Sequence, residues 1–174
     1  MSITAQELRQ IMPHAGARAE RYCSHLNTVM DRYEINTTER QAMFLAQIAH
    51  ESGSLRYTQE IASGAAYEGR EDLGNIEPGD GVQFKGHGFI QLTGRANHQK
   101  YADYKGMTLD EVLDYLQTDE GAADVAGWFW ETRGLNEIAD RGDFKLVTKR
   151  INGGTNGWQD RLAFYERAQN VLGA

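Results

Sequence analysis

Most of this chain has the pattern of amphipathic helices, and one long segment in its middle does not. Three expected helix starts, at residues 4, 38 and 108, have Thr followed three positions later by Glu or Gln. At this spacing the side chains satisfy the first free amides of a helix. Between residues 54 and 97 the helical period disappears and glycine recurs. Such long segments inside compact domains are usually functional. The pattern predicts a mainly α-helical domain with a glycine-rich loop that carries at most a short hairpin.

The helices are expected where apolar residues repeat at helical spacing. These stripes are Tyr22, Leu26, Val29, Met30 and Tyr33; Ala42, Leu45, Ile48 and Ala49; Phe144, Val147 and Ile151; and Leu162, Tyr165, Ala168 and Leu172. A helix from about residue 118 to 132 contains Trp128, Phe129 and Trp130, which we expect in the core. No linker or repeat divides the chain, so residues 1–174 are expected to form one domain. We expect two helical lobes, with the glycine-rich segment lining a cleft between them.

The net charge of −7 argues against a nucleic-acid or membrane-surface protein, because both partners are anionic. No apolar run approaches the ~18 residues of a membrane span, and the first residues do not resemble a secretion signal. We therefore expect a monomer that is made in the cytoplasm without a signal peptide and does not insert into membranes. The single cysteine, Cys23, excludes an internal disulfide and is expected to be buried.

Two glutamates lie near the boundary between helix and loop. His50-Glu51-Ser52-Gly53 stands at the expected end of the third helix, and Glu60 follows in the loop. A carboxyl group at a helix end can project into a cleft, where burial favours its protonated form, while a carboxylate in a solvated loop stays ionised. Glycoside hydrolysis uses such a pair, since one group protonates the leaving oxygen and the other activates water or attacks carbon. Two solvated surface glutamates are the alternative reading.

The segment after Glu60 adds groups that suit a sugar ligand. Gly86 and Gly88 permit close backbone approach, and Gln91, Thr93 and Asn97 offer amide and hydroxyl groups for sugar hydroxyls, N-acetyl groups or a bound water. The segment does not match the dinucleotide-binding fingerprint, which needs a third glycine at position 91. Position 54 is Ser where a zinc-protease motif starting at His50 would need a second His. We expect neither a metal nor a cofactor.

Four ordered blocks resemble glycoside hydrolase family 19, and within it the compact phage endolysins related to plant chitinases. The blocks are Phe44-Leu45-Ala46-Gln47-Ile48-Ala49-His50-Glu51-Ser52, Phe84-Lys85-Gly86-His87-Gly88-Phe89-Ile90-Gln91-Leu92-Thr93-Gly94-Arg95-Ala96-Asn97, Ile151-Asn152-Gly153-Gly154 and Asp160-Arg161-Leu162-Ala163-Phe164-Tyr165. The resemblance runs from about residue 36 to the end. It implies a lysozyme-like fold of two helical lobes and an inverting hydrolysis. Glu51 matches the general acid of the family, Glu60 the general base, and Thr93 the residue that helps to hold the attacking water.

The resemblance also implies residues around this centre. The residues that match sugar-binding positions of the cleft are Gln91, Asn97 and Asn152. Arg161 matches an arginine that supports the site from the last helix, and His50, beside Glu51, is expected to support it too. His87 stands where the family commonly has Arg, and we expect it to contact substrate. Asn156 stands where the plant enzymes carry an acidic residue, so the ion pairs around Arg161 are expected to differ.

These matches favour an endolysin that hydrolyses the β-1,4 bonds of peptidoglycan glycan strands and lyses its host after release across the inner membrane. A chitinase is a close alternative, which the lack of a recognisable secretion signal argues against. A goose-lysozyme-like lytic transglycosylase is another, because Glu51-Ser52-Gly53 also resembles that group's motif, although it needs no counterpart of Glu60. A silent glycan-binding domain would require neither carboxylate.

Overall fold

The computed structural model describes residues 2–174, which fold into helices joined by loops, with no strand in that range. The α-helices are α1 (Ala5–Ile11), α2 (Arg18–Arg32), α3 (Thr38–Glu51), α4 (Asp80–Gln83), α5 (Arg95–Lys105), α6 (Leu109–Leu116), α7 (Asp119–Thr132), α8 (Leu135–Asp140), α9 (Phe144–Asn152) and α10 (Trp158–Leu172). Two short 3-10 helices, η1 (Ala65–Tyr67) and η2 (Glu71–Leu73), lie in the glycine-rich segment. The hairpin expected there is reduced to isolated antiparallel bridges that join His87 to Gln59 and to Leu92.

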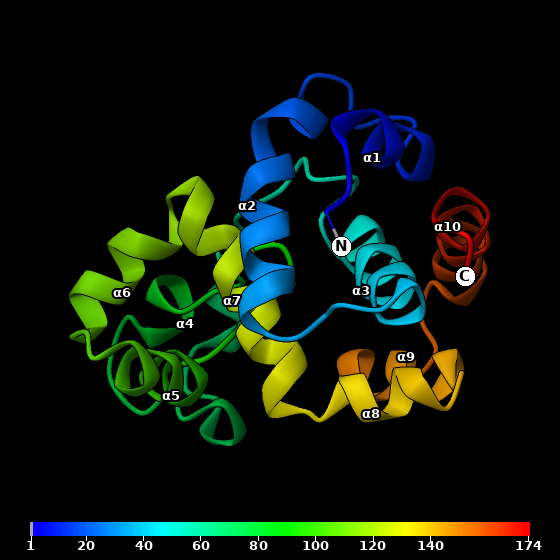
Figure 1. Cartoon of the computed structure of the whole chain (residues 1–174). Helices are drawn as coiled ribbons and strands as arrows, with labels where there is room; N and C mark the ends of the chain where they lie inside the picture. Colours follow the sequence, from blue (N-terminus) through cyan, green and yellow to red (C-terminus); the bar gives the residue numbers. More distant parts are fainter. Residues whose placement is uncertain (1) are drawn as a thin grey trace.

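The helices form two groups around the pair α2 and α7 (Figure 1). On one side lie α4, α5 and α6, and on the other lie α1, α3, α8, α9 and α10. The helix α10 packs along α3, and α2 packs along α7. The expectation of a mainly helical, lysozyme-like domain of two lobes is confirmed by this arrangement. No helix in residues 2–174 is long and apolar enough to cross a membrane.

Local sequence signals explain most helix starts. At Thr4 and Thr108 both halves of the expected capping box are present, since each hydroxyl accepts from the amide three residues on and the Glu side chain accepts in return. For α3 the cap is Thr37 and not Thr38, which corrects the sequence-based assignment. Thr37 has extended backbone, so its hydroxyl can accept from the Arg40 amide at 3.1 Å.

Apart from the four-residue α4, which lies inside the segment expected to be loop, two helices were not anticipated from the sequence. In α5 the residues that turn inward are His98, Tyr101 and Ala102, an apolar stripe too thin to stand out. The helix α8 has six residues, of which Leu135, Ile138 and Ala139 are buried. Both are short or polar helices whose stability comes from packing against neighbours more than from their own propensity.

The core is built around α7, whose Trp128, Phe129 and Trp130 are all buried, as expected. Gly127 allows α2 to approach closely, because a Cβ at this position would lie 2.3 Å from Cδ2 of Tyr33. Cys23 was expected to be buried, but its side chain is only half-buried. It lies on α2, and its sulfur donates to the Ile3 carbonyl oxygen at 3.3 Å.

A buried carboxylate joins the central helices. Asp124 on α7 is fully buried and accepts hydrogen bonds from the hydroxyls of Tyr33, at 3.0 Å, and Tyr101, at 2.5 Å. Arg32 on α2 pairs with the same carboxylate, and Lys105 at the end of α5 lies 3.5 Å from it. Because a buried charge is tolerated only when it is paired and hydrogen-bonded, this cluster fixes α2, α5 and α7 to one another.

Candidate active site

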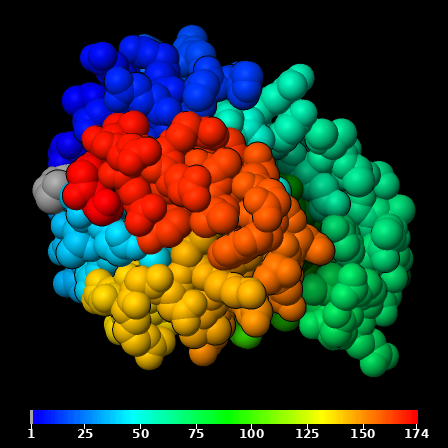
Figure 2. Space-filling model, turned by 90° about the vertical axis from the view of Figure 1, so that its right-hand side faces the viewer, coloured from blue at the N-terminus to red at the C-terminus, as the bar shows by residue number. Residues whose placement is uncertain are grey.

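A cavity of about 270 Å³ lies where α3 ends and the glycine-rich segment begins. Its lining residues are Glu51, Tyr57, Gln59, Glu60, Ile61, Ala62 and Gln91. Figure 2 shows the face on which the C-terminal helices and the segment after α3 stand on either side of a recess. The structure therefore brings the two candidate carboxylates, which the sequence separates by a helix end and a loop, to one cavity.

Glu51 is the last residue of α3, and its carboxylate is held from α10. Arg161, which is 1% exposed, donates from Nη2 to Glu51 Oε1 at 2.6 Å and from Nη1 to Gln47 Oε1 at 2.5 Å. Its Nε donates to the backbone carbonyl oxygen of Asn156 at 2.9 Å. At position 156 the guanidinium is therefore bound by a backbone carbonyl oxygen and not by an acidic side chain.

The second oxygen of Glu51 faces a different environment. Within residues 2–174 no group donates a hydrogen bond to Oε2, and the side chain is 20% exposed. One oxygen of the carboxyl group is therefore fixed by Arg161, and the other is available to carry a proton or to meet a ligand. This asymmetry is what a proton donor at the wall of a cavity needs.

His50 lies beside this centre, on the other side of the helix end. Its Nδ1 lies 2.7 Å from Asp160 Oδ2. Gly157, at φ +71°, approaches so closely that a Cβ there would lie 2.2 Å from His50 Cε1. The pairing of His50 with Asp160 joins the end of α3 to the first turn of α10, which also carries Arg161. The supporting role of His50 at the site stays a prediction.

Glu60 is held by two donors. The hydroxyl of Tyr67 donates to Oε1 at 2.9 Å, and the amide of Gly86 donates to Oε2 at 2.9 Å. The backbone amide of Glu60 donates in turn to the Gly86 carbonyl oxygen at 2.8 Å. Donors aimed at both oxygens fix the direction of the carboxylate, and each oxygen keeps a further lone pair for a water molecule.

The three polar residues predicted in segment 86–97 form one chain of contacts. Thr93 Oγ1 donates to the Gln91 carbonyl oxygen at 3.0 Å, and Asn97 Nδ2 donates to the Thr93 carbonyl oxygen at 2.9 Å. Gln91 lines the cavity and has φ +59°, a left-handed conformation that is costly without glycine. Its Nε2 donates to the Gly88 carbonyl oxygen at 2.9 Å. Thr93 and Asn97 are half-buried behind Gln91.

The expected substrate contact of His87 is wrong. Its ring is 2% exposed, and its Nδ1 lies 2.9 Å from Nε2 of His98 on α5. The Nδ1 of His98 lies 2.7 Å from the Gly94 carbonyl oxygen. The bridges of His87 to Gln59 and Leu92 hold the ring between two segments of chain, so it points into the domain. A neutral imidazole fits there, whereas an arginine would carry an unpaired charge into the interior.

We expect the histidine pair to make the domain less stable in acid. Burial lowers the pKa of His87 and of His98 from 6.5 to about 4, with Lys85 adding to the effect at His87 and Glu60 opposing it. The unfolded chain therefore binds more protons than the folded one as the pH falls from 6.5 towards 4, and the free energy of unfolding falls in that window. Because one pKa unit is worth about 1.4 kcal/mol, the loss should amount to several kcal/mol.

Urea unfolding between pH 7.5 and 4.5 measures this loss. His98→Asn removes one titrating group and should flatten the pH dependence, while His14→Gln, at an exposed histidine, should leave it unchanged. Equal pH dependence in wild type and His98→Asn would contradict the assignment.

Asn152, at the end of α9, keeps a buried side-chain nitrogen without a partner. Its Nδ2 has no hydrogen-bond partner in the described chain. A buried donor left unpaired costs about 1–3 kcal/mol, so Nδ2 is free to donate to a ligand, and the role of Asn152 in sugar binding stays a prediction. It does not line the cavity that contains Glu51 and Glu60.

Sequence reasoning missed several residues of the site. Tyr57, Gln59, Ile61 and Ala62 line the cavity, and Tyr67 holds Glu60. One signal for these residues was present in the sequence, which was the apolar Ile61 in a polar loop. In the structure Ile61 is 76% exposed. Tyr67 gave no signal, because its contact with Glu60 depends on how the loop turns at η1.

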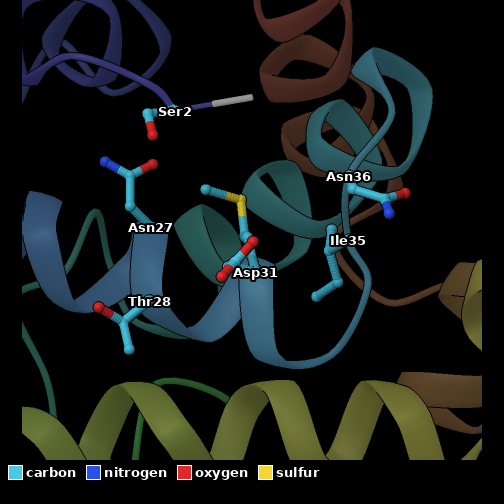
Figure 3. A pocket seen from close by; sticks show the side chains of 7 residues that line it. Ser2, Asn27, Thr28, Asp31, Ile35 and Asn36 are labelled. Carbon is cyan, nitrogen blue, oxygen red and sulfur yellow. The ribbon is translucent and has the colours of Figure 1, made fainter.

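A second cavity, of about 320 Å³, lies beside α2 near the start of the chain (Figure 3). Its lining residues are Ser2, Asn27, Thr28, Met30, Asp31, Ile35 and Asn36. Asp31 is the one carboxylate among these residues, so the cavity lacks the pair that two-carboxylate hydrolysis needs. Of these two cavities, only that of Glu51 and Glu60 holds a pair of carboxylates.

Comparison with known proteins finds a glycosyl hydrolase family 19 domain-containing protein and endochitinases among the relatives of this chain. No protein-family model matches the chain. It is 26% identical over 196 residues to a glycosyl hydrolase family 19 domain-containing protein of Haemophilus influenzae, and the match covers 95% of this chain and 94% of that protein. It is 34% identical over 157 residues to an endochitinase of Arabidopsis thaliana, with 90% of this chain and 52% of that protein covered. The chain thus spans nearly all of the bacterial relative and about half the length of the plant one.

Solved structures share the fold. Chitinase C from Streptomyces griseus matches with a TM-score of 0.80 at 22% identity, covering 99% of this chain and 77% of that chain. A class IV chitinase from Zea mays matches with a TM-score of 0.75 at 22% identity, covering 96% of this chain and 90% of that one. Sequence relatives and structural neighbours agree with the resemblance found in the four sequence blocks, which is thereby confirmed at the level of the family.

Proposed function

This chain is a chitinase-related glycoside hydrolase with the family 19 fold, and we propose that it is an endolysin that hydrolyses β-1,4 bonds in the glycan strand of peptidoglycan. The observation that carries the proposal is the cavity lined by both Glu51 and Glu60. Two carboxyl groups held in different ways at one cavity are the equipment of glycoside hydrolysis.

In the proposed mechanism Glu51 is the acid. Arg161 fixes Oε1, and Oε2 delivers the proton to the leaving glycosidic oxygen. Glu60, held in place by Tyr67 and Gly86, takes a proton from the attacking water. The Thr93 hydroxyl donates to the Gln91 carbonyl and keeps its oxygen free to accept from that water. Gln91, Asn97 and Asn152 bind sugar.

The rim of the cavity supports a branched substrate. Ile61, Ala62 and Ser63 are exposed, and the last two have small side chains. Peptidoglycan carries a peptide on alternate sugars, so its enzyme needs a groove with an open edge, whereas an unbranched polymer does not. A chitinase remains the second candidate, because the Arabidopsis relatives are endochitinases. A lytic transglycosylase is less consistent with the site, because a one-acid reaction would leave the hydrogen bonds to Glu60 without a purpose.

Product analysis tests the proposal. Purified peptidoglycan and soluble N-acetylglucosamine oligosaccharides are digested, reduced with borohydride and analysed by mass spectrometry. Reduced muramic ends identify a muramidase and reduced glucosamine ends a glucosaminidase, and either result supports a hydrolase of the wall. Anhydro-muramic ends identify a transglycosylase, and cleavage of the oligosaccharides alone identifies a chitinase. Each of the last two results would overturn the proposal.

We expect the first product to be the α-anomer. In an inverting enzyme the two carboxyl groups stand roughly 6.5–9.5 Å apart, so that a water molecule fits between base and substrate, whereas a retaining enzyme brings them to about 5–5.5 Å. With Glu60 activating water, attack comes from the face opposite the β-linked leaving group. Proton NMR during the first minutes of digestion, before mutarotation, reports the anomer. An initial β-anomer would exclude Glu60 as a base acting through water.

A further inference from the structure

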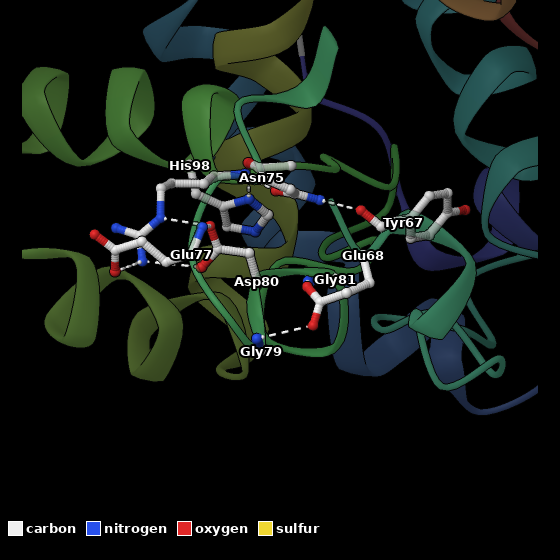
Figure 4. Close-up of polar contacts among 10 residues, drawn as sticks. Tyr67, Glu68, Asn75, Glu77, Gly79, Asp80, Gly81 and His98 are labelled. Atoms are coloured by element: carbon white, nitrogen blue, oxygen red, sulfur yellow. Dashed lines mark hydrogen bonds and ion pairs between the residues drawn. The ribbon is translucent and has the colours of Figure 1, made fainter. Parts of the chain in front are cut away.

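Residues 68–80, which we call the acidic loop, contain Glu68, Glu71, Asp72, Glu77 and Asp80. One asparagine of this loop is buried although the residues after it are exposed. Asn75 is 1% exposed, while Ile76 beside it is 75% exposed. Its side chain uses both ends: Nδ2 donates to the Tyr67 carbonyl oxygen at 2.9 Å, and Oδ1 accepts from the Arg95 amide at 2.9 Å. Figure 4 shows Asn75 between Tyr67 and the network around Asp80. Asn75 thus joins two segments that the chain separates.

The first of these segments leads to Glu60. Tyr67 ends η1, and its hydroxyl donates to Glu60 Oε1 at 2.9 Å. Its carbonyl oxygen is the group that Asn75 holds. A tyrosine whose main chain is fixed by one hydrogen bond can aim its hydroxyl reproducibly at a carboxylate, so the direction of Glu60 depends on the bond made by Asn75.

The second segment leads to Thr93. Arg95 is the first residue of α5, and the residue before it, Gly94, has no side chain with which to cap the helix. Asn75 supplies that missing acceptor from a distant part of the chain, because its Oδ1 takes the free amide of Arg95. Thr93 precedes this turn and is also bonded by Asn97 from the next turn of the helix.

A salt-bridge cluster keeps the loop around Asn75 in place. Asp80, 1% exposed, accepts from Nε and Nη2 of Arg95, each at 2.9 Å, and Glu77 pairs with the same guanidinium at 2.9 Å. The Arg95 guanidinium lowers the pKa of Asp80, so this carboxylate stays ionised in neutral solution. Glu68 accepts from the amides of Gly79 and Gly81. These ion pairs and hydrogen bonds hold the acidic loop in place, and Asn75 joins it to Tyr67 and to the start of α5.

We propose that Asn75 is a positioning residue for the hydrolysis, which sets Glu60 through Tyr67 and sets Thr93 through the start of α5. The inference rests on the proposed function, because it concerns the base and the water of that reaction. It assigns a role to the acidic loop, although Asn75 does not line the cavity that contains Glu51 and Glu60. Its consequence is that Asn75 controls the rate of the chemical step and leaves sugar binding to other residues.

The test compares Asn75→Ala with Asn27→Ala. Asn27 is a matched control, because its side chain also bridges two segments, donating to the Ile3 carbonyl and accepting from the Ile3 amide at 2.9 Å each, and it lies at the other cavity. The substrate is the better cleaved of a soluble peptidoglycan fragment and a soluble N-acetylglucosamine oligosaccharide. Asn75→Ala should lower kcat by about 10- to 100-fold with KM within about two-fold, and Asn27→Ala should change neither by more than about two-fold once folding is matched.

Tyr67→Phe tests the connection to Glu60 alone, because it removes the hydroxyl that donates to Glu60 and leaves the Tyr67 carbonyl oxygen in place. It removes only one oxygen atom, so it is expected to fold even if Asn75→Ala does not. It should lower kcat by about 10-fold with KM within about two-fold, because the Glu60 carboxylate loses the donor that fixes Oε1. Unchanged kcat in folded Asn75→Ala or in Tyr67→Phe would overturn the positioning role. Glu60→Gln distinguishes failure of the positioning role from failure of the proposed mechanism, since an active Glu60→Gln variant would refute Glu60 as the base.

Discussion

The Glu51→Gln variant is expected to remain folded and to lose hydrolytic activity by about 10²- to 10⁴-fold, the usual worth of a general acid. The amide is nearly isosteric with the carboxyl group, and its oxygen can still accept from Nη2 of Arg161, so the contact between α3 and α10 survives. What the amide lacks is an acidic proton on the second oxygen. Activity is measured as release of reducing ends from purified peptidoglycan, and folding by circular dichroism and thermal unfolding.

Glu71→Gln is the matched control, since Glu71 is an exposed glutamate of the acidic loop. It removes the same charge and should leave the rate unchanged. If folded Glu51→Gln keeps more than about a tenth of the wild-type activity, the acid role belongs to another group.

The Arg161→Leu variant is expected to lose both stability and activity. The guanidinium is 1% exposed and donates to three acceptors, namely Glu51 Oε1, Gln47 Oε1 and the Asn156 carbonyl oxygen. Removing one partner of a buried ion pair typically costs about 3–5 kcal/mol, because the remaining charge is left uncompensated. In a domain of this size that corresponds to a fall in Tm of roughly 10 °C.

Thermal unfolding and the hydrolysis assay are run together on Arg161→Leu and on Arg141→Leu, in which an exposed arginine is replaced. Arg141→Leu should match wild type in both. The double variant Arg161→Leu with Glu51→Gln should be less destabilised than the sum of the single changes, since the lone carboxylate is then gone. Additive losses would mean that Arg161 and Glu51 do not act as a pair.

The fold was predictable where its signals were local. Capping residues such as Thr4 and Thr108 sit within a turn of the groups they bind, and the long stripes of α2, α3 and α10 follow the helical period. The helices α5 and α8 escaped prediction because their few inward residues make sense only against neighbours that the sequence does not reveal. The cap of α3 was misplaced by one residue because two threonines are adjacent there, and Thr37 is the one whose backbone is extended.

The candidate site was predictable as a pair of carboxylates and not as a set of contacts. Glu51 and Glu60 stood out by residue type at a helix end and in a loop, and the structure brings them to one cavity. Tyr67 and Asn75 did not, because their partners lie in segments joined by the turns of the glycine-rich loop. His87 was misread because motif position says nothing of burial.

The bond between Arg161 and Glu51 spans 110 positions of the chain, from the end of α3 to the first turn of α10. During synthesis the acid is therefore made long before the residue that orients it. Domains fold as units once enough of their chain has emerged, and here the last helix supplies a group without which Glu51 is unsupported. A nascent chain that has not yet released α10 from the ribosome therefore lacks the donor that fixes Glu51 Oε1.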